Sequence, residues 1–479
     1  MTHVVVVGGG VAGLAAAHEL ADSTDHAAPA STVTLVEAAH LGGKLRSGRL
    51  GDAVVDVGPD GFLARRPEAT ALIGELGATG QLEPVGAQGA WVLARGRLRR
   101  LPPGLALGVP TKMRDLRTSD AIGILGLRGA IRAGMDLVAP RPARRSALQD
   151  RAIGPLVADK LGDRVVEMLV DPLIGGIHAG RVRELSAAAV YPPVLAAGQV
   201  RGSMMRALQA AAPPTGGAAL GPAFLTLRDG LGALGELFAA SLRQRGVDVR
   251  CGTEVRTVHR GAPGMPRWRV ESDQGSLDCD AVVLATPASH TAGLLAPLDA
   301  DAAALTAAID TAGVVVVTLR FAGPAVDLPE GGTGVLIPVG TRLGATSYLT
   351  TAVTFLDRKW PHLARDGEQL LRVSMGRVDD RRPFELSDEE IVARVEEEIV
   401  ELFGGSCAPT SSLVWRWPDA FPQYRVNHLV RVEGIETAVG ALGGVAVAGA
   451  SYRGVGIPAC IASGRAAARA VRAWLGQQS

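Results

Sequence analysis

The sequence predicts an α/β fold, α+β overall, because three patterns follow one another along its 479 residues. An apolar, β-branched run opens the chain and leads through glycines into an alanine-rich helix, which is the order of a βαβ unit. Strand patterns recur between residues 247 and 375 with few helices among them, which is typical of a mixed sheet. The stretch from about residue 100 to 215 is helical in pattern and is predicted to be an insertion.

The first βαβ unit lies at the very N-terminus. His3–Val7 is a β-branched apolar run, as expected of a strand that is buried on both faces. Gly8–Gly13 follows with the spacing G-x-G-x-x-G, and Leu14–Ala21 is predicted to be the helix. Thr32–Glu37 is a second apolar strand that ends in an acid. Together these segments predict a Rossmann-like domain.

Each glycine of this turn has a separate physical role. Gly8 permits the tight turn, Gly10 lets the backbone approach a pyrophosphate, and Gly13 lets the helix pack closely on the strand. The helix N-terminus supplies N–H groups and partial positive charge. Glu37 lies where a carboxylate accepts from ribose hydroxyls and disfavours a 2′-phosphate, so a dinucleotide other than NADP is expected.

Further glycine segments favour FAD over NAD. Two glycine-containing segments, Leu41–Lys44 and Asp56–Gly61, follow soon after Glu37. A third glycine-rich segment, Gly449–Pro458, lies near the other end of the chain. A long, extended dinucleotide needs such repeated backbone contact, from a domain assembled out of both ends. Because no second G-x-G-x-x-G occurs, reduction by a nicotinamide is disfavoured. We therefore expect a flavin that an organic substrate reduces and that O₂ reoxidises.

The remaining elements follow from periodicity. Ser387–Phe403 is a strongly amphipathic helix, and Ser387 with Glu390 predicts its capping box. Other helices are predicted at Leu156–Val170, Leu185–Ala212, Leu231–Arg245 and Ile461–Leu475. Strands are predicted at Val247–Cys251, Glu254–Arg260, Trp268–Ser272, Ala281–Ala285, Val314–Phe321, Ser347–Phe355, Gln369–Met375 and Val445–Gly449.

These patterns divide the chain into three units. The FAD-binding domain is expected to comprise residues 1–95, 216–298 and 413–479. The helical insertion would span 96–215, as a membrane-surface or substrate-entry domain, and the substrate-binding domain 299–412. At roughly 150 residues per domain, the length accommodates this division.

Composition excludes several classes of protein. With 49 basic and 48 acidic side chains the net charge is +1, which argues against a general nucleic-acid binder. An apolar content of 47% excludes a disordered chain. The four cysteines form no C-x-x-C pair and no Cys/His cluster, so a reducing compartment and no metal site are expected. Without a signal peptide or a 20-residue apolar span, the protein is expected to be cytoplasmic.

One segment, residues 91–145, departs from this balance. It contains twelve Lys and Arg against three Asp, so the rest of the chain is mildly acidic. Three interpretations are open. The arginines are solvated and without a specific role, or they form a patch that contacts a membrane surface. Alternatively, they attract an acidic substrate.

Several motifs resemble the porphyrinogen oxidases of haem biosynthesis, within the monoamine-oxidase-like flavoproteins. The N-terminal turn is shared by that whole superfamily, whereas the later motifs are narrower and look like the Gram-positive branch, whose members mostly oxidise coproporphyrinogen III. The match spans nearly the whole chain. The motifs are Val4–Gly13 with Glu37, Gly42–Lys44, Gly58–Pro67, Pro172–Gly180, Ala285–Pro287, Phe421–Tyr424 and Gly449–Pro458.

The resemblance implies a non-covalent FAD. Val255 would reach the adenine through its backbone. Mitochondrial and plastid relatives have a basic residue where this chain has Asp60, and some Gram-positive relatives have lysine at the position of Arg66. The implied FAD contacts are Gly8, Gly9, Gly10, Val11, Ala12, Gly13, Glu37, Ala38, Gly43, Lys44, Gly58, Pro59, Asp60, Gly61, Val255, Trp417, Val455, Gly456 and Ile457.

The implied reaction is the six-electron oxidation of coproporphyrinogen III to coproporphyrin III, in three hydride transfers to the flavin, with H₂O₂ as co-product. Oxidation of protoporphyrinogen IX is the alternative, and a non-catalytic escort of the same fold is a remote one. The resemblance also leaves open a contact with other haem-pathway enzymes. Because the flavin performs the chemistry, no catalytic side chain is expected.

Four residues are candidates for substrate contact. Arg65 and Arg66 follow the flavin loop and would bind carboxylates. His178 would lie near the substrate, although a structural histidine is the competing interpretation. Tyr348 is a candidate for the pocket wall.

Overall fold

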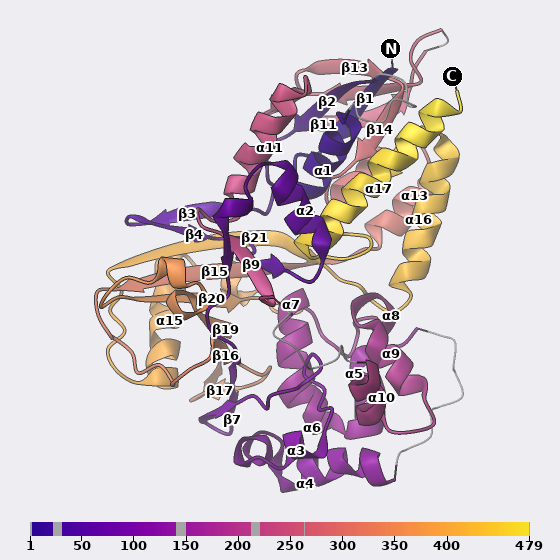
Figure 1. The fold of residues 1–479 in the computed structure, drawn as a ribbon. Helices are drawn as coiled ribbons and strands as arrows, with labels where there is room; N and C mark the ends of the chain where they lie inside the picture. The colour runs from indigo at the N-terminus through magenta and orange to yellow at the C-terminus, as the bar shows by residue number, and fades with distance from the viewer. Residues whose placement is uncertain (1, 23–30, 140–149, 212–220, 263, 479) are drawn as a thin grey trace.

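The computed structural model describes residues 2–22, 31–139, 150–211, 221–262 and 264–478. It confirms the α/β class and the mixed second sheet. The parallel-sheet domain contains both ends of the chain, and a seven-stranded sheet and a helical region lie below it (Figure 1).

The parallel sheet has the strand order β10-β2-β1-β14-β22, and all four pairings are parallel. Its strands are β1 (Thr2–Val7), β2 (Ser31–Glu37), β10 (Asp248–Cys251), β14 (Ala281–Leu284) and β22 (Val445–Val447). The central strand β1 alternates, with Val4 and Val6 in one core cluster and Val5 and Val7 in another. The sheet is therefore covered on both faces, as its apolar sequence predicts.

Different elements cover the two faces. The first core cluster contains residues of α1 (Val11–Leu20), α2 (Pro67–Glu75), α11 (Ala233–Gln244) and α17 (Ile457–Gly476). The second contains residues of the antiparallel sheet β11 (Val255–Arg260), β12 (Trp268–Ser272) and β13 (Gly275–Cys279) and of the helices α12 (Ala288–Leu295), α13 (Ala300–Ala307) and α16 (His428–Leu442).

The helices α1 and α17 pack side by side, although they come from opposite ends of the chain (Figure 1). A Cβ on Gly464 would overlap the backbone of Ala12, so only glycine allows this approach. Further along, Arg469 pairs with Glu19, which lies at the other end of α1. The two helices therefore run in the same direction, and both N-termini lie at one end of the domain.

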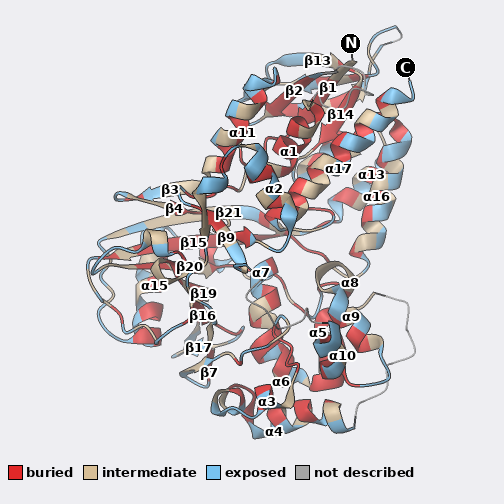
Figure 2. Ribbon diagram, viewed as in Figure 1, coloured by how far each residue is buried: buried red, intermediate tan, exposed pale blue. Residues whose placement is uncertain are grey.

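The second sheet has the order β21-β15-β20-β19-β16-β7-β8, and only the β16–β7 pair is parallel. Its strands are β21 (Ser411–Pro422), β15 (Thr311–Phe321), β20 (Gln369–Met375), β19 (Thr350–Phe355), β16 (Gly334–Leu336), β7 (Trp91–Ala94) and β8 (Arg97–Arg100). One face packs against the buried side of α15 (Asp388–Phe403), whose other side is exposed (Figure 2). The predicted capping box is present, since Ser387 and Glu390 bond to each other's backbone N–H.

The segments of this sheet cross the domain boundaries that the sequence suggested. Residue 95 lies in the turn between β7 and β8, and residue 413 lies within β21. We propose that residues 91–100 and 411–422 belong with the substrate domain, because their strands pair with β16 and β15. The extension to 100 also moves three of the twelve basic residues of segment 91–145, Arg97, Arg99 and Arg100, out of the helical insertion.

The helical region is more broken than its sequence pattern indicated. Its elements are α3 (Met113–Leu116), α4 (Ser119–Val138), α5 (Ile153–Leu161), α6 (Asp163–Val165), the π-helix η2 (Val166–Gly175), α7 (Gly176–His178), α8 (Ala187–Val190), α9 (Pro192–Gln199) and α10 (Met204–Ala211). The single helix predicted over Leu156–Val170 is interrupted at Gly162, which has a positive φ of 95°. Arg141, Arg144, Arg145 and Ala212, which the predictions included, lie outside the described residues.

The remaining elements are short connections. None of the helices in the described residues is long and apolar enough to cross a membrane. The connections are β3 (Ser47–Leu50), β4 (Ala53–Asp56), β5 (Phe62–Leu63), η1 (Thr79–Gln81), β6 (Leu82–Pro84), β9 (Phe224–Leu227), β17 (Arg342–Leu343), β18 (Thr346–Ser347), α14 (Leu356–Lys359), η3 (Pro361–Leu363) and η4 (Arg382–Phe384).

Candidate cofactor and substrate site

The N-terminal glycine turn has the geometry that the sequence predicts. Gly8 has a φ of 105°, and a Cβ on it would lie 2.7 Å from the carbonyl oxygen of Ala285. A Cβ on Gly13 would overlap the carbonyl oxygen of Gly8. At Gly10, by contrast, no described atom beyond its chain neighbours lies within 4 Å of the position a Cβ would take. The turn is thus closed on its inner side and open at Gly10, where a ligand can approach the backbone.

Glu37 is bound to this turn through both carboxylate oxygens. Its Oε2 accepts from the Gly9 N–H at 2.6 Å, and its Oε1 accepts from the Ala39 N–H at 2.8 Å. Each oxygen retains a lone pair, so the carboxylate can still accept from a ribose hydroxyl. Glu37 therefore has a structural role in the turn in addition to the predicted ribose contact, which stays a prediction.

The second and third glycine segments lie directly against the first. The Gly42 N–H donates to Gly9 O at 2.8 Å, and a Cβ on Gly43 would lie 3.1 Å from the Cα of Gly10. A Cβ on Gly58 would overlap the carbonyl oxygen of Lys44. The glycine pattern predicted that these segments contact one cofactor, and in the structure they lie in contact with one another.

Lys44 is a half-buried cation without an acid partner in the described residues. Its ammonium donates to the carbonyl oxygen of Ala420. Burial lowers the pKa of Lys44, and the Cys460 thiol and the Asp419 carboxylate oppose this effect only in part. A carbonyl does not neutralise the charge, so two ammonium donors and a net positive charge are left beside the glycine loops. This environment fits an anionic cofactor.

The last glycine segment leads into the N-terminus of α17. Gly456 is the N-cap and Pro458 occupies the first turn. The first N–H groups of both α1 and α17 have no acceptor within their own helices, and both helix ends carry partial positive charge. Because the helices run in the same direction, their N-termini can contact different parts of one extended dinucleotide. Val455, Gly456 and Ile457 are therefore well placed for the predicted contact.

Asp60 has partners that the sequence pattern did not reveal. Its carboxylate pairs with Lys359 Nζ at 2.7 Å and accepts from Trp360 Nε1 at 3.2 Å. Although burial raises it, the Lys359 and Arg372 charges hold the pKa of Asp60 well below its usual range. A Cβ on Gly61 would lie 2.7 Å from the Trp360 ring. The Asp60 side chain thus fixes the loop to α14, and only its backbone remains available to a cofactor.

Two residues of the seven-stranded sheet contact the loop of residues 57–61, which we call the cofactor loop. Trp417 donates from Nε1 to Val57 O at 2.8 Å. Arg372 donates from Nη2 to Gly58 O at 2.5 Å and from Nη1 to Asp56 O at 3.2 Å. Arg372 was missed, since neither its spacing nor its neighbours in the sequence distinguish it from an ordinary strand residue.

Val255 lies at the other end of the site. It is buried at the start of β11, and nearby the Thr253 N–H donates to Glu37 O at 3.0 Å. The segment that leads into β11 is therefore hydrogen-bonded to Glu37, the residue predicted to contact the ribose.

The sheet face that carries Trp417 and Arg372 is only partly covered. Directly paired residues of antiparallel strands share a face. The register pairs Val316 with both Ser374 and Trp415, and Ser374 with Ala352. Ser374, Trp415 and Ala352 are half-buried, as is Val314, whereas the opposite face is sealed by α15. We call Val314, Ala352, Ser374 and Trp415 the open face.

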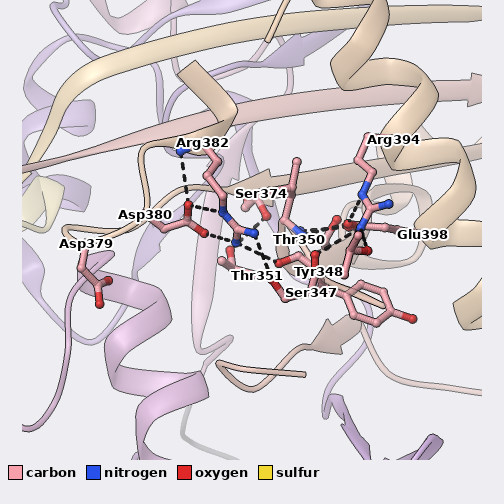
Figure 3. A network of polar contacts seen from close by, with 12 residues as sticks. Ser347, Tyr348, Thr350, Thr351, Ser374, Asp379, Asp380, Arg382, Arg394 and Glu398 are labelled. Carbon is pink, nitrogen blue, oxygen red and sulfur yellow. Dashed lines mark hydrogen bonds and ion pairs between the residues drawn. The ribbon is translucent and has the colours of Figure 1, made fainter. Parts of the chain in front are cut away.

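Tyr348 belongs to the other side of the sheet. Its side chain packs in the core cluster with α15, and burial with the nearby Glu401 and Glu398 charges raises its pKa to about 12. The Leu349 and Thr350 N–H groups donate to the buried Glu398 carboxylate at 2.8 and 3.0 Å (Figure 3). The structure therefore does not bring Tyr348 to the glycine loops. Strand alternation alone does not tell which face of the sheet α15 covers, so this position of Tyr348 could not be predicted from the sequence.

This segment is held by two arginines (Figure 3). Arg394 donates to Glu398 Oε1 at 2.9 Å and to Ser347 O at 3.1 Å. Arg382 pairs with Asp380 at 2.6 Å and donates to Ser347 Oγ at 2.9 Å. The network fixes the start of β19, the central strand of the sheet.

Arg65 and Arg66 are exposed just beyond the cofactor loop. Arg66 precedes α2 and pairs with Glu68 at 2.9 Å. Arg65 has no ion pair within the described parts of the chain. Both guanidinium groups can therefore be reached by the carboxylates of a ligand.

His178 is buried where the helical region contacts residues 423 and 424, just after β21. Burial lowers the pKa of His178 to about 4, so its ring is neutral at pH 7. Its carbonyl oxygen accepts from Gln423 Nε2 at 2.9 Å, and its ring centroid lies 6.3 Å from that of Tyr424. The ring Nδ1 of His178 is buried without a hydrogen-bond partner among the described residues, so the substrate contact stays a prediction.

Comparison with known proteins gives consistent matches over the whole chain. The sequence profile of the family described as "Flavin containing amine oxidoreductase" matches residues 11–472. A coproporphyrinogen III oxidase of Bacillus subtilis (strain 168) is 32% identical, with 97% of each chain covered. The coproporphyrinogen III oxidase of Mycobacterium tuberculosis (strain ATCC 25618 / H37Rv) is 35% identical over 98% of this chain and 97% of its own. Human protoporphyrinogen oxidase is 30% identical over 98% of each chain.

Solved structures agree on the fold. A crystal structure from Exiguobacterium sp. 255-15, described under the name protoporphyrinogen oxidase, superposes with a TM-score of 0.85 at 29% identity, covering 98% of this chain and 99% of that one. Cyclohexylamine oxidase from Brevibacterium oxydans IH-35A shares the fold at a TM-score of 0.65 and 16% identity, with 98% and 99% covered.

Proposed function

The chain belongs to the flavin containing amine oxidoreductases, and from this premise we propose that it binds FAD non-covalently and oxidises coproporphyrinogen III to coproporphyrin III. The observation that carries the proposal is the similarity, at 32 to 35% identity and almost full length in both chains, to proteins named coproporphyrinogen III oxidase. The human relative, a protoporphyrinogen oxidase, keeps protoporphyrinogen IX as the alternative substrate.

The glycine loops supply the support for FAD. The open backbone at Gly10 and the helix N-termini of α1 and α17 suit a pyrophosphate. The ammonium of Lys44, which has only a carbonyl acceptor, suits an anionic group of the cofactor. When bound, FAD would accept two electrons and a hydrogen in each oxidation step.

The chain's own residues would bind and orient the substrate. Six hydrogens leave the porphyrinogen, and three O₂ become three H₂O₂, so the reaction balances without another reductant. The open face would form an apolar floor beside the cofactor loop, and Arg65 and Arg66 would bind carboxylates. Coproporphyrinogen has four propionates and protoporphyrinogen two, so these arginines favour the former. A side chain acting as acid or base is not required.

The exposed surface of α4 supports the membrane-surface interpretation of segment 91–145. Leu127, Ile131, Met135 and Val138 are each at least half exposed, and their spacing places them on one face of the helix. Exposed Arg128 lies beside this stripe. An apolar stripe with neighbouring positive charge suits an anionic lipid surface. A haem-pathway enzyme with an acidic surface is the alternative occupant.

Sedimentation with lipid vesicles tests this surface. We expect the protein to sediment with vesicles that contain an anionic lipid, to remain in solution with neutral vesicles, and to dissociate as salt is raised. Sedimentation that is equally absent from both vesicle types would exclude the membrane interpretation.

The central experiment measures flavin, porphyrin and peroxide together. The purified protein should carry flavin absorbance, and under air it should form fluorescent coproporphyrin with about three H₂O₂ per porphyrin. Absence of bound flavin would leave only a non-catalytic binding role. Faster oxidation of protoporphyrinogen IX than of coproporphyrinogen III would replace the preferred substrate by the alternative.

The four cysteines are free thiols. We propose that the protein functions in a reducing compartment, the cytoplasm.

A further inference from the structure

The loop that precedes α17 is closed by one tyrosine hydroxyl. Tyr424, at the end of β21, is 1% exposed. Its hydroxyl donates to Ala450 O at 2.5 Å and accepts from the Gly454 N–H at 2.8 Å. The same oxygen therefore bonds both sides of the loop formed by residues 449–456. That loop ends at Val455–Ile457, where the cofactor contact of α17 is expected.

His428 makes a third bond to the same loop. Its imidazole stacks on the Tyr424 ring, with centroids 3.9 Å apart and planes 14° from parallel. Its Nε2 lies 2.8 Å from Tyr452 O. A carbonyl only accepts, so this nitrogen carries the proton. We refer to Tyr424 and His428 as the loop clamp.

The clamp is bonded on its other side to the helical region. Gln423 Nε2 donates to His178 O at 2.9 Å, and the Ser186 N–H donates to Tyr424 O at 2.7 Å. Arg425 pairs with Glu184. The start of α16 and the helix α8 are in contact where these bonds occur (Figure 1). Consecutive residues thus bond the loop of residues 449–456 on one side and the helical region on the other.

We propose that the loop clamp positions residues 449–456 for FAD, and that through Gln423 it couples FAD affinity to the binding of a porphyrin. Tyr424 is a positioning residue, because it acts through the backbone of the loop. The first half of this inference rests on membership of the flavin family, and the second half rests on the proposed porphyrin substrate.

The clamp has a direct energetic consequence. Without the Tyr424 hydroxyl, Ala450 O and the Gly454 N–H lose their partner in a partly buried setting. The loop would relax to satisfy them in other conformations, only some of which would hold the backbone of Val455–Ile457 in the binding geometry. FAD would then bind the fraction of molecules in the competent state, and its apparent affinity would fall by that fraction.

The first test is FAD affinity of the full-length chain. Flavin is removed, and FAD is titrated back while the quenching of its fluorescence is measured. We expect Tyr424→Phe, which keeps the ring and the stack, to raise the Kd for FAD about tenfold. Tyr191→Phe, a matched change in the helical region, should leave the Kd unchanged.

A purely structural tyrosine gives a different result. If Tyr424→Phe lowers the melting temperature of the flavin-free protein but leaves the Kd for FAD unchanged, the positioning role is wrong. If this variant does not fold, His428→Phe is measured instead, since it keeps a stacked ring and removes the donor to Tyr452 O. It carries the same expectation and the same contradictory outcome.

The second test is the coupling itself, with coproporphyrin III as the probe because it is stable under air. In the unchanged protein, saturating coproporphyrin should tighten FAD binding, and by linkage FAD should tighten coproporphyrin by the same factor, expected to be about five. Gln423→Ala, which removes the bond to His178 O, should reduce this factor to about one.

The outcomes separate the two proposals. Failure of coproporphyrin to bind the unchanged protein would contradict the proposed substrate and leave the FAD result for Tyr424→Phe standing. Binding of coproporphyrin with a factor of one in the unchanged protein, or with an unchanged factor in Gln423→Ala, would overturn the coupling.

Discussion

The two faces of the seven-stranded sheet differ although the same strands form both. On one face Val315, Val317 and Leu319 are fully buried beneath α15. On the other, Val314 and the rest of the open face are half-buried next to the cofactor loop. Strand alternation produces both patterns, and the long helix α15 covers only the first face. The sealed face supplies stability, and the incompletely covered face is the one that can accept a ligand.

The largest expected effect is a loss of stability on the face of the sheet that α15 covers. Glu398→Ala would leave the Leu349 and Thr350 N–H groups without an acceptor and Arg394 without its buried partner. We expect the free energy of unfolding to fall by about 3 to 4 kcal/mol in chemical denaturation. Glu397→Ala, at a side chain 67% exposed, is the control and should change it by less than about 0.5 kcal/mol. Similar losses in both variants would contradict the distinction between the faces.

A smaller effect on stability is expected from Asp56, which ends β4 directly before the cofactor loop. Burial raises the pKa of Asp56 to about 6. A raised carboxyl pKa means that the folded state binds the proton more tightly, so its contribution to stability is present at low pH and is lost as pH rises from about 4 to 6. Asp56→Asn should remove this decline and raise the free energy of unfolding at pH 7.5 by about 2 kcal/mol.

Denaturation curves between pH 4 and 8 check the Asp56 prediction. Asp366→Asn, at an exposed carboxyl group, is the matched control and should keep the decline. An equally steep decline in Asp56→Asn would show that another group is responsible.

Filling the open face should reduce catalysis more than stability. Ala352→Phe adds a ring where the proposed floor is half-buried, so we expect kcat/KM for coproporphyrinogen III to fall about tenfold. The free energy of unfolding should change by less than about 1 kcal/mol. Ala304→Phe, at an exposed position of α13, should leave both quantities unchanged. A large loss of stability in Ala352→Phe would mean that this face is sealed as well.

The smallest effect, on substrate binding, is expected at Arg65, which is exposed just beyond the cofactor loop. Arg65→Ala removes one exposed guanidinium, so the KM for coproporphyrinogen III should rise about threefold and should depend less on ionic strength. Arg256→Ala, at an exposed position of β11, is the control. An unchanged KM and salt dependence would remove Arg65 from the substrate site.

The difference between local and long-range interactions decides what the sequence could predict. The glycine turn, Glu37 and the Ser387 capping box are local patterns, and the structure contains all of them. Lys359 as the partner of Asp60, by contrast, is about 300 residues away in the chain, and no local pattern joins the two. The same holds for β7 and β8, whose sheet depends on pairing with β16.

The candidate site shows the same limit. Its loops were predictable because glycines must stand where backbones approach closely, as at Gly13 and Gly58. The open face was not predictable, since a period of two gives two faces without saying which one a distant helix will cover. Tyr348 was assigned to the substrate for that reason, and the structure places it against α15 instead.

The contact between α1 and α17 also bears on synthesis. Gly464 packs on Ala12, and β22 joins β14 only at Val445–Val447, so the cofactor site is shared by two segments that are translated far apart in time. A nascent chain still short of residue 445 has β1 and its glycine turn but not the helix beside them. Because domains form as their segments leave the ribosome, capture of the flavin must await translation of α17, and until then one flank of α1 stays uncovered.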